Sequence, residues 1–205
     1  TELTSGLPIQ FSNAAGITSF TMTLNYDPAL LNISQVQLGS NAPANSQIEA
    51  NLSSPGTINI AFFSLDPIAV SQAELIRLVA SVPQTATYGA THALSLTSIE
   101  VNAGAINAVA QDAIHVVAFP GDANANRRYD AEDARLIARV GVGLDTGFVF
   151  SPPAGQPASA ASRLYALIDP TIIGDVTGVD GISPLDASDI LRRVVGLPTP
   201  NIPPL

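Results

Sequence analysis

Two segments in the second half of the chain repeat one arrangement of glycine and aspartate at the same spacing. The first copy starts at Gly121-Asp122 and closes on Asp133-Ala134. The second copy starts at Gly174-Asp175 and closes on Asp186-Ala187, so that each copy spans twelve positions from its first to its last aspartate. An apolar-periodic segment follows each copy, which favours a helix there. The repeat therefore predicts two loop-helix units within residues 120–205.

The spacing of oxygen-bearing residues in the first copy suits a hard cation. Calcium takes roughly 6–8 oxygen ligands, and a twelve-residue loop can supply them from positions 1, 3, 5, 7, 9 and 12. The first copy has an oxygen-bearing side chain at each of these positions except position 7, where a backbone carbonyl serves. The predicted ligands are Asp122, Asn124, Asn126, Arg128 (through its carbonyl), Asp130 and Asp133. We therefore expect a Ca²⁺ site in this loop.

The second copy fits the same pattern less completely. Its position 5 is Val179, which has no side-chain oxygen, and Asp180 stands one place late. Either the loop bulges so that Asp180 coordinates the ion, or Val179 contributes only its carbonyl, and both possibilities remain open. The predicted ligands are Asp175, Thr177, Val179, Asp180, Gly181, Ser183 and Asp186. We expect a second Ca²⁺ site that is weaker or distorted.

Aspartate at the end of each copy also has a purely structural interpretation. Asp133 and Asp186 suit helix N-caps, where a carboxylate accepts backbone N–H groups without any metal. The agreement of two copies at one spacing favours the metal interpretation. We expect the following helices to cover residues 134–140 and 187–195, and to end at Gly141 and Gly196.

Residues 1–119 alternate apolar and polar side chains with period two, which is typical of strands buried on one face. Segment 71–80 could form a helix by propensity, but its apolar run is short and we expect a strand from Leu75 onward. The expected strands are Leu7–Phe11, Ser19–Tyr26, Leu31–Leu38, Thr57–Phe63, Leu75–Val82, His92–Val101 and Ile114–Phe119. Short strands separated by Gly, Pro, Asn and Asp turns favour an antiparallel β-sandwich.

Composition excludes several classes of function. The net charge of −9 disfavours nucleic-acid binding, and the absence of Lys and Cys removes Schiff-base, P-loop and thiolate chemistry. No apolar run of about 18 residues could span a membrane. His92 and His115 lie in expected strands, and no pair of carboxylates suggests a glycosidase. We therefore expect no enzyme.

Residues 121–198 resemble dockerin modules, the duplicated calcium loop-and-helix units of cellulosomes and related extracellular assemblies. The likeness is carried by the Gly-Asp starts, the Asn-x-Asn of the first copy and the Asp-Ala closings. Arg127 stands where a glycine is common. The resemblance implies partner recognition around Ala131-Glu132 and Pro184-Leu185 and along the helices that follow, at Arg135, Arg139, Arg192 and Arg193. These positions differ between the copies, so a symmetric binding mode is not supported.

The first part of the chain is similar to cohesin modules, the β-sandwich partners of dockerins. A turn and a strand lead into Tyr26-Asp27-Pro28-Ala29-Leu30-Leu31, and Gly56–Phe63 resembles a later strand of the same family. The resemblance implies an antiparallel, jelly-roll-like sandwich that binds another protein.

The sequence as a whole predicts a mainly β chain with a small α part. We expect a cohesin-like sandwich over residues 1–119 and a dockerin-like domain of two F-hand calcium loop-helix repeats over 120–205. The expected function is that of a non-catalytic extracellular or cell-surface scaffold or adhesion fragment. Its partner would be a cohesin- or dockerin-type module, in another chain or in the same chain. A calcium-stiffened spacer with intramolecular domain packing and a carbohydrate-binding sandwich remain alternatives.

Overall fold

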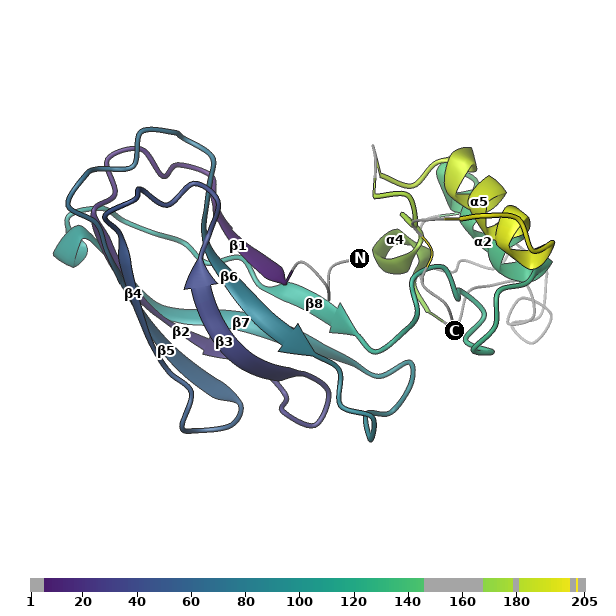
Figure 1. The fold of residues 1–205 in the computed structure, drawn as a ribbon, viewed down its shortest axis with the longest axis horizontal. Helices are drawn as coiled ribbons and strands as arrows, with labels where there is room; N and C mark the ends of the chain where they lie inside the picture. Colours follow the sequence, from purple (N-terminus) through teal and green to yellow (C-terminus); the bar gives the residue numbers. More distant parts are fainter. Residues whose placement is uncertain (1–5, 146–167, 179–180, 200–201, 203–205) are drawn as a thin grey trace, which may run out of the picture. The chain divides into compact units, whose positions relative to one another are not determined.

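The structure is a computed structural model that describes residues 6–145, 168–178, 181–199 and 202 (Figure 1). The chain folds as two compact units, residues 2–115 and residues 116–205, and each is described by itself. The expected division after residue 119 stays a prediction for the boundary between functional modules.

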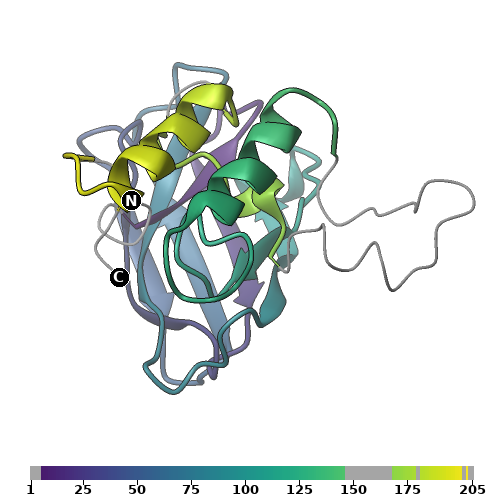
Figure 2. The same ribbon diagram turned by 90° about the vertical axis from the view of Figure 1, so that its right-hand side faces the viewer.

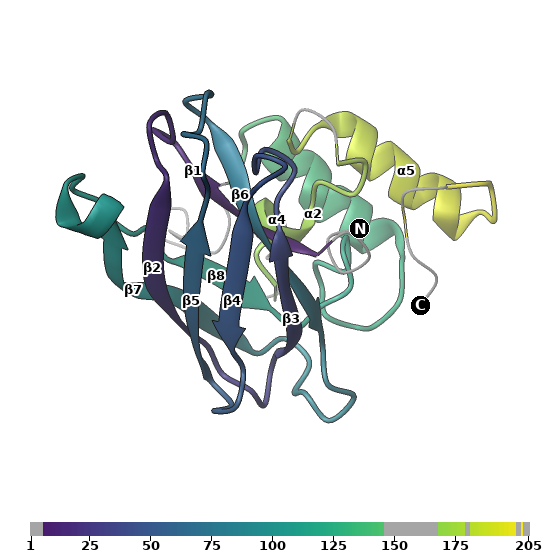
Figure 3. The ribbon, with the colours of Figure 1, turned by 60° about the vertical axis from the view of Figure 1, so that its left-hand side comes forward.

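Two sheets build the first unit. One has three strands in the order β1-β6-β3, and the other has five in the order β4-β5-β2-β7-β8. Figure 3 shows β2, β5 and β4 side by side in the larger sheet. The strands are β1 (Leu7–Phe11), β2 (Ser19–Asn25), β3 (Asn32–Leu38), β4 (Gln47–Asn51), β5 (Thr57–Phe63), β6 (Ala73–Ser81), β7 (Thr91–Val101) and β8 (Ala113–Val116). The antiparallel β-sandwich expected from the alternation is confirmed.

The core lies between the sheets and is built by the alternating residues of the strands. In β2, Phe20, Met22 and Leu24 are buried, and Phe20 pairs across the sheet with buried Phe62 of β5. The Phe20 and Phe62 rings stack with their centroids 4.8 Å apart, and the ring of Phe11 lies at the same distance from Phe20. Aromatic pairs at this separation add to the free energy gained by burying apolar area. The period-two alternation therefore places the apolar side chains of the strands together in one packed core.

Three strands differ from the sequence expectation by more than one residue. Strand β4 was not expected, because Ile48 and Ala50 are its only apolar residues and it lies at the edge of the sheet. Strand β6 begins at Ala73, so the helical alternative for segment 71–80 is wrong. Pairing with β1 on one side and β3 on the other decides this segment, because both of its backbone edges are used. Strand β8 ends at Val116 and not at the expected Phe119.

The second unit contains α2 (Ala131–Gly141), α4 (Pro170–Ile173) and α5 (Pro184–Val194). Figure 2 shows α2 and α5 side by side. Ile137 of α2 and Ile190 of α5 are fully buried. In the described part of the chain, none of the helices is both long enough and apolar enough to cross a bilayer.

Both long helices begin three residues earlier than expected. The N-caps are Asp130 and Ser183, whereas Asp133 and Asp186 are the third helical residues. Each of these aspartates accepts the backbone N–H of its N-cap residue, which completes a reciprocal capping box. The N-cap assignment of Asp133 and Asp186 is therefore wrong.

Both long helices end in the same way. The expected end of the first helix at Gly141 is wrong, and the expected end of the second at Gly196 is confirmed. Gly141 is still helical, and the left-handed residue that ends α2 is Gly143, with φ +71°. Gly196, with φ +76°, ends α5 as expected. In both cases the next N–H, from Leu144 or Leu197, bonds a carbonyl five residues back, which is the Schellman arrangement.

Replacing Leu75 by alanine should test the sandwich core. Leu75 in β6 has 0% exposure, so Leu75→Ala should lower the free energy of unfolding by about 2–5 kcal/mol, through lost burial and a cavity. Leu65→Ala is the matched control, because Leu65 is 71% exposed, and its effect should stay within about 0.5 kcal/mol. Urea unfolding followed by far-ultraviolet circular dichroism measures both. Equal effects of the two variants would contradict the described core.

Candidate interaction face and candidate calcium loops

The outer face of the five-stranded sheet carries a shallow hollow of about 490 Å³. Because Phe20, Met22 and Leu24 point into the core, their neighbours in β2 point outward. The side chains that face outward around the hollow are Thr21, Thr23, Glu49, Asn51, Asn59 and Ala61. Small polar residues from three adjacent strands therefore leave room for part of another molecule.

Hydrogen bonds between strands hold these outward side chains in place. The Thr23 hydroxyl donates to Asn59 Oδ1 at 2.9 Å, and Asn25 Nδ2 donates to Thr97 Oγ1 at 3.1 Å. A bulge in β7, where Ser98 has φ +50°, shifts the register against β2 and places Ser98 beside the hollow. A surface ordered in this way loses little side-chain entropy when it binds a partner.

Two exposed apolar side chains stand at the end of this face. Phe63 is 49% exposed at the end of β5, and Leu65 just beyond it is 71% exposed. Phe62 and Phe63 are neighbours in β5 and therefore face opposite sides of the sheet, and the buried one is Phe62. Exposed aromatic residues beside a polar surface are typical anchors in protein interfaces. The sequence missed the face as a whole, because its residues come together only through the order of the strands.

The two histidines form a hydrogen-bonded pair on β7 and β8. His92 Nε2 lies 2.9 Å from His115 Nδ1, and the backbone N–H of Asp27 donates to His92 Nδ1 at 2.9 Å. Because His92 Nδ1 accepts, the ring proton of a neutral His92 is on Nε2, which then donates to His115. A proton added to His92 Nδ1 or His115 Nδ1 would face an N–H group. This geometry holds both imidazoles neutral.

Burial acts in the same direction on both histidines. It lowers the pKa of His92, although the charge of Asp27 opposes the shift. Burial, together with the neighbouring His92, lowers the pKa of His115 to about 4. The pair links β8 to β7 and to the turn at Asp27.

Stability of the first unit should fall on acidification through this pair. An unfolded histidine titrates near 6.5, whereas the folded pKa of His115 is about 4, so the unfolded chain binds more protons between these values. The contribution of neutral His115 to the free energy of unfolding is therefore complete above pH 6.5 and is lost as the pH falls toward 4. Thermal unfolding of the wild type and of His115→Gln should show a gap in melting temperature that narrows over this range. A gap independent of pH would contradict the assignment.

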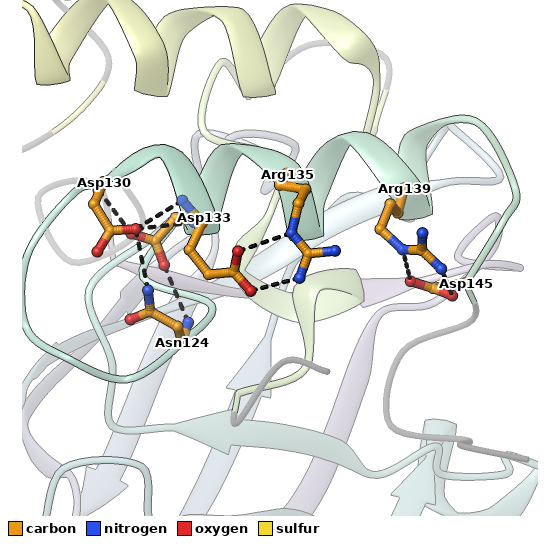
Figure 4. A network of polar contacts seen from close by, with 7 residues as sticks. Asn124, Asp130, Asp133, Arg135, Arg139 and Asp145 are labelled. Carbon is orange, nitrogen blue, oxygen red and sulfur yellow. Dashed lines mark hydrogen bonds and ion pairs between the residues drawn. The ribbon is translucent and has the colours of Figure 1, made fainter. Parts of the chain in front are cut away.

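The first predicted calcium loop folds around its last carboxylate. Asp133 is fully buried, and its two oxygens accept the backbone N–H groups of Asn124 at 3.0 Å and Asp130 at 2.9 Å. Asp122 is also buried and accepts the N–H of Asn126 at 3.1 Å. Figure 4 shows Asn124, Asp130 and Asp133 gathered at the start of α2. The five predicted side-chain ligands of this loop therefore lie together.

Asparagine side chains connect the same loop to Asp130. Asn124 Nδ2 donates to Asp130 Oδ1 at 3.2 Å, and Asn126 Nδ2 donates to Asp130 Oδ2 at 2.6 Å. The backbone of Arg127 is left-handed, with φ +62°, at the position where glycine is common. Next to it, the N–H of Arg128 donates to Asn126 Oδ1 at 2.8 Å. The loop thus keeps a tight turn without a glycine.

The second loop repeats this arrangement around Asp186, with hydroxyl groups in place of amides. Asp186 accepts the backbone N–H and the hydroxyl of Thr177, at 3.0 and 2.9 Å, and those of Ser183, at 2.8 and 3.0 Å. Asp175 accepts the N–H of Gly178 at 2.7 Å. Val179 and Asp180 lie outside the described residues, and the described Gly181 is left-handed, with φ +75°. The choice between Val179 and Asp180 as ligand therefore stays open.

The two buried aspartates differ in how their charge is compensated. Burial, with the nearby charges of Asp130 and Asp122, raises the pKa of Asp133 to about 6, against two backbone hydrogen bonds. For Asp186, burial acts the same way, but hydrogen bonds from Thr177 and Ser183 outweigh it and lower the pKa. The first loop therefore concentrates negative charge that a cation would compensate, whereas the second loop supplies its own hydroxyl donors.

The donor set of the first loop fits calcium. None of the ion pairs among the described residues uses Asp130 or Asp133. The described residues contain no cluster of three or more His, Cys, Asp or Glu arranged as a metal site. A calcium loop of this spacing would draw part of its ligands from Asn side chains and a backbone carbonyl, which such a cluster does not include. The calcium sites stay predictions.

Comparison with known families identifies the first unit. The family model described as the cohesin domain matches residues 5–116, which is more than half of the chain. No curated protein matches the chain.

Solved cohesin structures are similar to part of this chain. A non-cellulosomal cohesin from the archaeon Archaeoglobus fulgidus is 26% identical, with a TM-score of 0.39, and the match covers 46% of this chain and 63% of that one. This chain thus spans less than two thirds of the archaeal cohesin. The solution structure of CaCohA2 from Clostridium acetobutylicum is 21% identical, with a TM-score of 0.46, and the match covers 54% of this chain and 79% of that one.

Proposed function

The chain belongs to the cohesin family, and we propose that the outer face of its five-stranded sheet binds a dockerin module of another protein. Cohesin domains are non-catalytic interaction modules that bind dockerins. The observation that carries the proposal is the ordered hollow beside Phe63, which combines small polar side chains with an exposed aromatic ring. Such a surface can pack against the helices of a partner without first rearranging.

The second unit would act as a dockerin-like module that binds calcium. Support comes from the two loops, in which the last aspartate accepts the N–H groups of loop positions 3 and 9 in both copies. The more tightly bound calcium ion would lie in the first loop. Its ligands would be the side chains of Asp122, Asn124, Asn126, Asp130 and Asp133 and the backbone carbonyl of Arg128. Bound calcium would compensate the buried negative charge of the loop, and its binding energy would then stabilise this small unit.

The partner-binding side of this unit would be the α5 side. Leu185 and Leu191 of α5 are 59% and 47% exposed. In α2, Glu132 instead forms an ion pair with Arg135. The apolar side chains therefore favour α5 as the face that contacts a cohesin-type module. Calcium-dependent association of this kind suits an extracellular or cell-surface location, where calcium is abundant enough for weak loops.

A charged side chain in the hollow should block dockerin binding. Ala61→Arg places a long cation in the centre of the proposed face, and we expect dockerin affinity to fall by about tenfold or more. Gln10→Arg is the matched control, because Gln10 is exposed on β1 of the other sheet and should leave affinity unchanged. Surface plasmon resonance measures the affinity of both variants. The full chain is tested against a panel of dockerin modules and against a second copy of this chain. Absence of binding to every member would contradict the proposal.

Calcium should bind the first loop and stabilise the second unit. Isothermal titration into chelator-treated protein should show binding, and calcium at 100 times its Kd should add about 2.7 kcal/mol to the free energy of unfolding. Asp122→Ala should remove the tighter event. Asp189→Ala on α5 removes the same charge outside the loops and should leave the event intact. A titration without heat, together with an unchanged melting temperature, would overturn the calcium assignment.

A further inference from the structure

A basic pocket lies on the second unit, between the first loop and the end of α5. It has a volume of about 280 Å³ and is lined by Arg127, Arg128, Tyr129, Arg193 and Val194. The first three residues belong to the first loop, and the last two belong to the end of α5. The packing of α5 beside α2 brings these distant segments together. Three arginines thus meet at one point of a chain whose net charge is −9.

Two arginines of this pocket, Arg128 and Arg193, differ from the ion-paired arginines of the described residues. The ion pairs among the described residues use Arg77, Arg135 and Arg139. Neither Arg128 nor Arg193 takes part in an ion pair within the described ranges. Arg193 is half-buried, so part of its side chain is held against the protein while its guanidinium can still meet a ligand.

Tyr129 contributes its half-buried side chain to the wall of the same pocket. Its hydroxyl is buried and has no hydrogen-bond partner among the described residues. The guanidinium groups of the three arginines are hydrogen-bond donors without acceptor atoms, which suits a negatively charged oxygen group.

We propose that this basic pocket binds a carboxylate side chain of an acidic protein partner. Guanidinium groups bind carboxylates through two parallel hydrogen bonds, and Val194 offers apolar contact for the methylene groups of a glutamate. A protein source rests on the proposed function, in which this unit docks onto a cohesin-type sandwich. The sandwich of this chain shows the fitting charge, because Arg77 is the one basic residue among residues 1–119 and is already paired with Glu74.

The test uses the full chain and a fluorescein-labelled hexaglutamate peptide in one calcium-containing buffer, with binding followed by fluorescence polarisation. Arg193→Gln and Arg128→Gln should each weaken binding tenfold or more. Arg192→Gln is the matched control, because Arg192 precedes Arg193 on the same helix, loses the same charge and does not line the pocket. It should change affinity less than twofold.

Three results would overturn the proposal. Hexaglutamate that does not bind the wild type would exclude the site. Equal weakening by Arg192→Gln and Arg193→Gln would show diffuse attraction and not a pocket. A hexagalacturonate probe that binds ten times more tightly than hexaglutamate, through the same arginines, would replace the protein carboxylate by an acidic sugar. The Ala61→Arg experiment reports on the other unit, so failure of the sheet-face proposal and failure of the pocket are distinguishable.

Discussion

The inward packing of β2 is the constraint on which the first unit depends. Phe20, Met22 and Leu24 lie in the core, and β5 and β7 pair with β2 on its two sides. Because side chains alternate along a strand, burying these three residues forces Thr21 and Thr23 to the outer face. A one-residue slip of β2 would expose the core and bury the polar residues at the same time. The core and the proposed interaction face are therefore two consequences of one register.

The second unit depends in a similar way on one buried aspartate in each loop. In each repeat, one buried aspartate closes the loop and accepts the backbone N–H of the N-cap residue, so the loop conformation and the helix start are coupled. The copies differ in what surrounds that carboxylate, which is more negative charge in the first and two hydroxyl groups in the second. This difference agrees with the prediction, made from the missing side-chain oxygen at Val179, that the second loop binds calcium more weakly.

Prediction from sequence worked where the local pattern was strong and failed where long-range pairing decided. The bounds of β1 and β5 agree with the expectation because their alternation is complete. Strand β4 was not predicted, because it contributes only two apolar residues at an edge. Helix α2 begins earlier than predicted, because Asp130, and not Asp133, accepts the first free N–H groups. The side chains that gather in the first loop could be predicted from the sequence because they are close together along the chain. The hollow beside Phe63 and the pocket at Arg193 were not, since their residues come from separate elements.

The sequence by itself determined the sandwich class, the acidic loop repeat and the positions of its candidate ligands, because each depends on periodicity or spacing within a short segment. Only the tertiary structure decided which strands are neighbours, which face of the sheet is hollow, how His92 meets His115 and where the arginines of the basic pocket gather. These features depend on contacts between residues far apart in the chain. A local pattern contains no information about such contacts until packing brings the segments together.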